Sequence, residues 1–144
     1  MIRQFAYKDA RAVFEIETEA FPKHDPWALL VFYGNVGECF MVAEQEGNVV
    51  GYIVGCRQTD TVGGILSVGV LKKYQGQGIG SELILAICSI FIANGFESVS
   101  LEVKNSNNRA KKLYQSLGFV PVRDAKTNFP NGIAGTKMVF SLEG

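Results

Sequence analysis

The segment that most constrains the fold of this chain is residues 66–81, where an apolar, strand-like run leads into a glycine-rich turn and then an apolar helix. Gly76, Gly78 and Gly80 stand in the turn. Glycine lets the backbone approach a ligand without an intervening Cβ atom, and the first N–H groups of the following helix point toward an anion. The pattern therefore predicts a phosphate-binding turn, with a diphosphate as the expected ligand.

Two well-known phosphate-binding patterns fit this turn poorly. A P-loop needs a lysine and then Ser or Thr directly after its last glycine, whereas Gly80 is followed by Ser81 and an acidic residue, so the P-loop is excluded. The dinucleotide fingerprint is a near match, because Ser81 occupies the place of its third glycine and Glu102 follows at a tolerable distance. A dinucleotide site therefore remains an alternative.

A second motif occupies residues 101–119, which read Leu-Glu-Val-Lys-Asn-Ser-Asn-Asn-Arg-Ala-Lys-Lys-Leu-Tyr-Gln-Ser-Leu-Gly-Phe. In this order, the two motifs resemble those of the GNAT acetyltransferases. Gln75, Gly78 and Gly80 match the coenzyme A pattern Q/R-x-x-G-x-G/A, and the later segment matches L-E-V-x-x-x-N-x-x-A-x-x-L-Y-x-x-L-G-F. Over residues 1–142 the chain most resembles the branch of ribosomal-protein-alanine and archaeal N-terminal acetyltransferases.

Composition is compatible with this resemblance. A chain of 144 residues with 47% apolar residues suffices for one compact domain over residues 1–144. Fourteen basic and fourteen acidic residues cancel, which argues against a broad surface for nucleic acid or an anionic membrane. The first residues are expected to enter structure directly, without a signal segment, and no apolar run approaches about 20 residues. A cytoplasmic protein is expected.

The cysteines do not indicate a disulfide or a metal site. Cys39, Cys56 and Cys88 are widely spaced in apolar surroundings and odd in number, so buried free thiols are expected. His24 is the one histidine of the chain, and no metal centre is predicted.

Apolar periodicity predicts an α/β chain with a mixed sheet and helices on both faces. Strands are expected in residues 2–7, 40–46, 49–56, 65–71, 99–103, 119–122 and 137–142, the second to fourth of them forming an antiparallel meander. Helices are expected after a cap at Asp9, in residues 27–33, from Ile79 to Asn94–Gly95, and from Ser106 or Asn107 to Gly118.

Local signals also predict the turns and one solvated face. Gly47–Asn48 is expected to form a tight hairpin turn, and Gly63–Gly64 the next turn along the chain. Glu15, Glu17 and Glu19 lie largely off the apolar face of the first helix, so a solvated surface is expected for them.

The resemblance implies a GNAT fold, with a central, mostly antiparallel sheet whose middle strands splay apart to admit the pantetheine arm of acetyl-CoA. Gly69 is then expected to mark a bulge or close approach, Gln75 to stabilise the turn or reach a phosphate, and Asn107 to contact the coenzyme or cap its helix. Arg109 is the candidate partner of the adenosine phosphate. The implied cofactor-binding residues are Val68, Gly69, Val70, Gln75, Gly76, Gln77, Gly78, Ile79, Gly80, Ser81 and Asn107.

Direct acetyl transfer requires a neutral amine, a donor for the oxyanion and a proton for the departing thiolate. Tyr114 resembles the general acid of the family, since a phenol with a pKa of about 10 can protonate a thiolate whose pKa is about 8.5. Glu102 resembles the general base of the alanine-specific enzymes. The oxyanion donor is expected to be the backbone N–H of Val70 or a neighbour. Without the resemblance, Tyr114 would be read as a packing residue and Glu102 as a surface residue.

The preferred acceptor follows from the cost of a neutral amine. An α-amino group with a pKa of about 8 costs about 1.4 kcal/mol to deprotonate at neutral pH, whereas lysine costs about 4.5 kcal/mol. This difference favours the N-terminus of a protein or peptide. A lysine or small amine remains an alternative acceptor, and a non-catalytic acyl-CoA sensor is a further alternative, disfavoured because Glu102 and Tyr114 are both present.

The acceptor-binding segments match the family only in part. Phe21–Pro22 matches one wall of the implied groove, but residues 128–134 read Asn-Phe-Pro-Asn-Gly-Ile-Ala where the family often has Tyr-Tyr-Pro followed by acidic residues. Phe21 and Phe129 are the candidate substrate-binding residues. The resemblance therefore supports the coenzyme more strongly than the acceptor.

Overall fold

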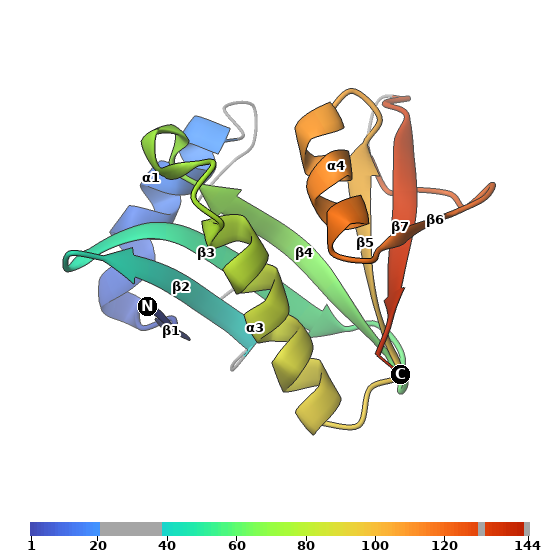
Figure 1. Ribbon diagram of the computed structural model, residues 1–144, viewed down its shortest axis with the longest axis horizontal. Helices are drawn as coiled ribbons and strands as arrows, with labels where there is room; N and C mark the ends of the chain where they lie inside the picture. Colours follow the sequence, from blue (N-terminus) through green and yellow to red (C-terminus); the bar gives the residue numbers. More distant parts are fainter. Residues whose placement is uncertain (21–38, 130–131, 143–144) are drawn as a thin grey trace. The chain divides into compact units, whose positions relative to one another are not determined.

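The computed structural model describes residues 1–20, 39–129 and 132–142 (Figure 1). Within these ranges a seven-stranded sheet has the order β1-β2-β3-β4-β5-β7-β6. Phe21, His24 and the expected helix at residues 27–33 lie outside the described residues. The mixed, mostly antiparallel α/β class predicted from the sequence is confirmed.

The chain forms two compact units. The first comprises residues 1–56 and 66–90, and the second residues 57–65 and 91–144. The elements, in chain order, are β1 (Ile2–Gln4), η1 (Tyr7–Asp9), α1 (Ala10–Ala20), β2 (Phe40–Gln45), β3 (Asn48–Arg57), β4 (Val62–Val70), η3 (Lys72–Tyr74), α3 (Ile79–Ala93), β5 (Ser98–Lys104), α4 (Asn108–Ser116), β6 (Val120–Val122) and β7 (Gly135–Ser141).

In the first unit, α1 and α3 lie against opposite faces of β3. Tyr52 points toward α1, where it joins a cluster with Val13 and Ile16. The neighbouring Gly51 faces the other way, because successive strand residues alternate between faces, and a Cβ atom on it would lie 3.2 Å from the Leu83 side chain of α3. The prediction of helices on both faces is therefore confirmed in this unit.

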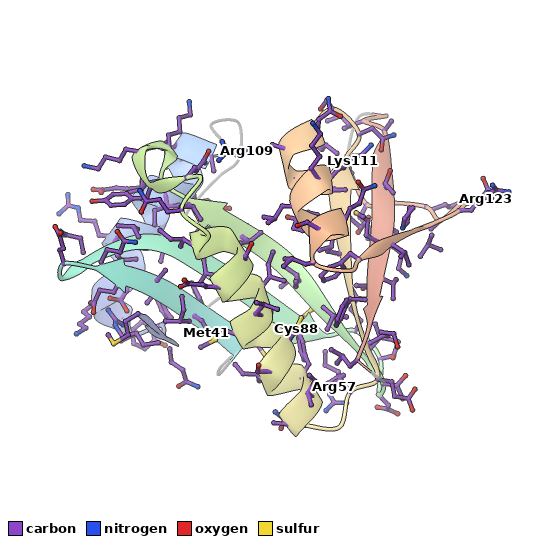
Figure 2. All side chains as sticks on the ribbon, viewed as in Figure 1. Met41, Arg57, Cys88, Arg109, Lys111 and Arg123 are labelled. Atoms are coloured by element: carbon purple, nitrogen blue, oxygen red, sulfur yellow. The ribbon has the colours of Figure 1, made fainter. Side chains whose placement is uncertain are left out.

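None of the three cysteines forms a disulfide within the described residues. Cys88 is buried on α3, as predicted (Figure 2), and burial raises the pKa of its thiol to about 11. Cys39 and Cys56 are only partly buried, which corrects the expectation of fully buried thiols. The thiolate of Cys88 is scarcely populated at neutral pH, and this thiol is unsuited to act as a nucleophile.

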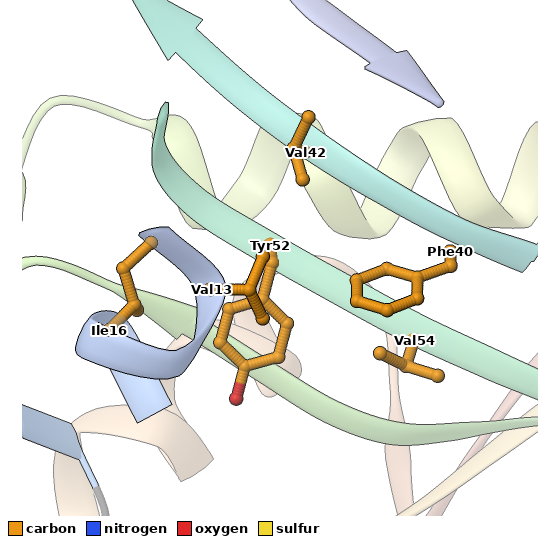
Figure 3. Packing of buried hydrophobic residues seen from close by; sticks show 6 residues of the cluster. All are labelled: Val13, Ile16, Phe40, Val42, Tyr52 and Val54. Atoms are coloured by element: carbon orange, nitrogen blue, oxygen red, sulfur yellow. The ribbon is translucent and has the colours of Figure 1, made fainter. Parts of the chain in front are cut away.

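The core of the first unit forms between α1 and the strands that face it. Phe5 stacks on Phe40 with 4.0 Å between the ring centroids. The fully buried cluster comprises Val13, Ile16, Phe40, Val42, Tyr52 and Val54 (Figure 3). Burial of such side chains contributes about 1.5–3 kcal/mol each.

A partly buried ion pair between Arg3 and Asp9 fixes the start of this unit. Asp9 is 4% exposed, and both of its carboxylate oxygens accept hydrogen bonds from the Arg3 guanidinium at 2.8 Å. Asp9 also accepts a bond from the backbone N–H of Ala6 at 2.8 Å. Asp9 therefore caps the short η1 helix that leads into α1. The sequence predicted that Asp9 would cap the following helix itself.

The predicted solvated face of α1 is wrong at one position. Glu17 is 1% exposed, although Glu15 and Glu19 are exposed as predicted. An amphipathic stripe predicts a single buried face, but Glu17 lies about 100° round the helix from the buried Ile16. Burial of α1 therefore extends beyond its apolar stripe.

Two predicted turns are displaced in the structure. The β2–β3 hairpin turns at Glu46 and Gly47, with φ values of 51° and 82°, rather than at Gly47–Asn48, since Gln45 pairs with Asn48. Gly63 and Gly64 lie inside β4 rather than in a turn. A Cβ atom on Gly63 would be 2.6 Å from the Phe91 ring, so its small size serves packing in the strand.

In the second unit, β5 lies between the start of β4 and β7. The parallel ladder of β4 with β5 comprises only Val62 to Gly64 against Ser98 to Ser100. By contrast, β5 and β7 pair in antiparallel fashion along the whole of β5, from Ser98 to Lys104. The helix α4 carries Tyr114, whose ring lies 6.0 Å from that of Phe119.

Candidate functional site

The glycine turn ahead of α3 presents unbonded backbone donors. Gly76 and Gly78 have φ values of 82° and 85°, and a Cβ atom on either would meet nothing within 4 Å. The first helical bond of α3 runs from the N–H of Glu82 to the carbonyl of Gly78 at 3.0 Å. Within the described residues, the N–H groups of residues 76–81 donate to no protein acceptor. The turn is therefore built to receive an anion.

Side-chain contacts hold the segment between β4 and α3. The Gln75 amide donates to the Val70 carbonyl at 2.9 Å, which matches the turn-stabilising role predicted for Gln75. The backbone N–H of Lys72 donates to the Glu19 carboxylate of α1 at 2.6 Å. The exposed Glu19 is thus an anchor of this segment, a contact that the sequence does not indicate.

Gly69 marks a close approach inside the first unit. A Cβ atom on Gly69 would lie 2.8 Å from the ring of Tyr52 and 3.2 Å from Ile16. The hydroxyl of Tyr52 shares a hydrogen bond of 2.7 Å with Ser67 on the same strand as Gly69. The predicted close approach is therefore present, and the partner that makes it is a core aromatic ring.

The carboxylate of Glu102, in the second unit, is held by a residue of the β6–β7 loop. Asn128 donates to Glu102 twice, from its backbone N–H to Oε1 at 2.5 Å and from its side-chain amide to Oε2 at 3.0 Å. Lys137 is the register partner of Glu102 on β7, but no ion pair joins them within the described residues. Sequence reasoning missed Asn128, because nothing local links residues so far apart.

Tyr114 is buried on α4, with 8% of its surface exposed. Burial raises the pKa of its phenol to about 12, because the phenolate would lose solvation. Within the described residues its hydroxyl has no hydrogen-bond partner. The phenol is therefore protonated at neutral pH, and its O–H group is available to donate a hydrogen bond to a ligand.

The start of α4 carries the two polar residues predicted to meet the coenzyme. Asn107 is the N-cap of α4 and accepts a hydrogen bond from the N–H of Ala110 at 3.1 Å, which confirms the capping role. Arg109, the second residue of α4, is exposed.

The remaining substrate candidate of the second unit is partly buried. A Cβ atom on Gly135 would overlap the ring of Phe129, so the ring packs directly on the backbone at the start of β7. Nearby, a surface hollow of about 520 Å³ is lined by Pro121, Val122, Arg123, Asp124, Ala125, Gly135 and Thr136. No predicted site residue lines this hollow.

The predicted site residues thus fall into two sets. The first unit holds Val68, Gly69, Val70, Gln75 and residues 76–81, and the second holds Glu102, Asn107, Tyr114 and Phe129. In the part of the chain that the structure describes, no three His, Cys, Asp or Glu side chains gather as metal ligands. Nor is any helix there long and apolar enough to span a membrane.

Comparison with known proteins identifies the family. The acetyltransferase (GNAT) family model matches residues 5–119. An uncharacterised N-acetyltransferase of Methanocaldococcus jannaschii is 40% identical, over 88% of this chain and 80% of the relative. An N-alpha-acetyltransferase of Sulfurisphaera tokodaii is 32% identical, over 91% and 86% of the two chains. A [ribosomal protein bS18]-alanine N-acetyltransferase of Haemophilus ducreyi is 27% identical, over 90% and 89%.

A solved structure agrees with this family assignment. Ard1 from Thermoplasma volcanium superposes with a TM-score of 0.89 at 29% identity, covering 98% of this chain and 96% of the other. These matches confirm the resemblance drawn from the two sequence motifs. The chain belongs to the GNAT family and is an N-acetyltransferase.

Proposed function

We propose that this protein transfers the acetyl group of acetyl-CoA to the N-terminal α-amino group of a protein or peptide. The observation that carries the coenzyme assignment is the run of unbonded N–H groups in residues 76–81, at the glycine turn and the start of α3. The names of the Sulfurisphaera and Haemophilus relatives support an α-amino acceptor. The lower cost of deprotonating an α-amine than a lysine supports it as well.

In this proposal the first unit binds the coenzyme. The N–H groups of residues 76–81 hold the pyrophosphate, and Gln75 keeps the turn in shape through Val70. The pantetheine arm lies along Val68, Gly69 and Val70, a role supported by the end of the β4–β5 ladder at Gly64 and Ser100. An N–H group of this strand, at Val70 or beside it, is the proposed oxyanion donor.

The acetyl group then moves by direct attack. The neutral amine attacks the thioester carbonyl, a C–N bond forms, and the C–S bond breaks as coenzyme A leaves. Before this attack, Glu102 takes a proton from the α-ammonium, directly or through water, and passes it to solvent. After the attack the nitrogen loses its second proton while Tyr114 supplies a proton to the sulfur, so the protons balance once Tyr114 regains a proton through water.

Burial of the Tyr114 phenol makes proton transfer to the thiolate less favourable. Transfer from a phenol with a pKa of about 12 to a thiolate of about 8.5 is uphill by about 5 kcal/mol. Tyr114 therefore acts first as a hydrogen-bond donor to the developing thiolate, and full transfer follows as negative charge accumulates on the sulfur.

Intact-mass analysis of a peptide library after incubation with acetyl-CoA tests this proposal. We expect an acetyl group on free peptide N-termini and none on N-terminally blocked peptides that contain lysine. Thiol release should match acetylation one for one. Acetylation of lysine or of small amines alone would overturn the acceptor assignment. Binding of acetyl-CoA without thiol release above background would instead indicate an acyl-CoA sensor.

A further inference from the structure

We infer that Asn128 is a positioning residue that orients the Glu102 carboxylate for catalysis. This inference rests on the proposed function, since it takes Glu102 to be the base. The geometry that carries it is the two-point contact, in which one residue donates to both carboxylate oxygens, at 2.5 Å and 3.0 Å. Two such bonds fix the plane of a side chain that would otherwise rotate between rotamers at a partly buried position.

The contact leaves Glu102 able to accept a proton. A carboxylate offers about four lone-pair sites, and Asn128 occupies one on each oxygen. The remaining sites can accept a water or an amine in a defined direction. The contact therefore orients the base without blocking it.

Asn128 is itself held by neighbours that do not involve Glu102. The adjacent Phe129 packs on the backbone of Gly135, where a Cβ atom would overlap the ring. At the other end of the loop, the N–H of Asn105 donates to the carbonyl of Ala134 at 3.0 Å. Because Asn105 directly follows β5, the loop is tied to the strand that carries Glu102, and Asn128 is preorganised.

The lysines near Glu102 do not hold its carboxylate through an ion pair. Lys137 lies opposite on β7 and Lys104 two residues along β5, but neither forms an ion pair with Glu102 in the described part of the chain. Lys126 on the loop makes no such pair either. Asn128 is thus the residue that orients the carboxylate.

Steady-state kinetics with acetyl-CoA and a synthetic peptide bearing a free N-terminal alanine test the inference. Asn128→Ala keeps the backbone bond but removes the side-chain bond, so kcat should fall about tenfold, with the KM for acetyl-CoA unchanged. Asn128→Asp should lower kcat further, because a second carboxylate repels Glu102. Gly135→Ala should repeat the effect of Asn128→Ala by displacing Phe129. Asn48→Ala, an exposed asparagine in the β2–β3 hairpin, is the matched control and should leave kcat unchanged.

The outcomes separate the two proposals. If the parent protein is active and kcat is unchanged or higher in Asn128→Ala and Gly135→Ala, the positioning role is wrong while the proposed function stands. A rise in the KM for acetyl-CoA with no change in kcat would also overturn it, because it would indicate a purely structural loop. A parent protein that acetylates no N-terminal amine would overturn the proposed function and this role together.

Discussion

Gln75 donates a side-chain hydrogen bond to the carbonyl oxygen of Val70 at 2.9 Å, which fastens the segment after β4 back onto the end of that strand. The bond joins the strand proposed to bind pantetheine to the turn proposed to bind pyrophosphate. Both parts of the proposed coenzyme site are therefore linked by one side-chain amide.

Replacing this amide should weaken coenzyme binding without unfolding the protein. Gln75→Ala removes a partly buried hydrogen bond worth about 1 kcal/mol, so the Kd for acetyl-CoA should rise about fivefold. Calorimetric titration measures the Kd directly. Gln115→Ala, on the exposed side of α4, should leave it unchanged. Equal affinity in Gln75→Ala and the parent would show that the turn keeps its shape without this bond.

Gly78→Val should abolish binding of acetyl-CoA. The Cβ branch would occupy the open space beside the unbonded N–H groups, and the φ of 85° adds backbone strain of about 1–2 kcal/mol. Gly47→Val is a matched control, because Gly47 has a φ of 82° and equally open surroundings in the β2–β3 hairpin. Both variants should lose similar stability on thermal unfolding, but only Gly78→Val should lose the coenzyme. If both variants lost acetyl-CoA binding, backbone strain alone would explain the loss in Gly78→Val.

The two motifs made the glycine turn and the helix cap predictable from the sequence. Positive φ at Gly76 and Gly78, the start of α3 at Ile79 and the capping of α4 by Asn107 all depend on residues within a few positions. Local patterns of this kind are set by backbone sterics and by unpaired helix ends. They therefore appear in the chain before any tertiary contact is known.

Contacts between distant residues were not predictable in this way. The bond between Asn128 and Glu102 and that between Lys72 and Glu19 join separate elements, and neither partner stands in a distinctive local pattern. The turn predicted at Gly63–Gly64 is wrong for a similar reason. Gly63 leaves room for the ring of Phe91, which lies almost thirty residues later in the chain. A glycine pair signals a turn or a close approach, and only tertiary packing decides between them.

Replacing Asp9 should lower stability in a manner that depends on pH. Arg3 holds the pKa of the Asp9 carboxyl below its usual range, so its stabilising contribution is complete above about pH 4 and is lost as pH falls through the folded-state pKa. Asp9→Asn should therefore cost about 2 kcal/mol at pH 7 and clearly less near pH 2, since Arg3 keeps its ion pair with Glu44 at 3.1 Å. Urea denaturation at the two pH values measures both costs. A cost that does not change with pH would show that the Asp9 charge is not the source of stability.

The buried phenol of Tyr114 predicts a loss of stability at high pH. Its folded-state pKa of about 12 exceeds the unfolded value of about 10, so the unfolded state releases its proton first and stability falls as pH rises from 10 to 12. Tyr114→Phe removes this group and should be less sensitive over that range, by up to about 3 kcal/mol. Cys88→Ala in both backgrounds removes the other buried group that titrates there, with a pKa of about 11. Parallel stability curves for Tyr114→Phe and its parent would contradict the burial-induced shift.

Glu102→Gln should distinguish the role of Glu102 from that of Tyr114. Glu102→Gln keeps the shape of the side chain, and the Asn128 amide can rotate so that both hydrogen bonds to residue 102 persist. This variant therefore loses the base but keeps its contact with the loop. Turnover should fall at neutral pH and recover in part as the pH approaches 9, because the α-amine then loses its proton without assistance.

Tyr114→Phe should behave differently. It keeps the ring that packs near Phe119 but removes the donor, so kcat should fall about 10²-fold or more, with little change in acetyl-CoA affinity. Raising the pH to 9 should not restore it, since the missing proton belongs to the leaving thiolate rather than to the amine. Steady-state pH profiles of the parent and both variants measure this contrast. If both variants had the same pH profile as the parent, in height and in shape, the catalytic roles would be wrong. Glu102 would then serve only as the anchor of the β6–β7 loop, and Tyr114 only as a core residue.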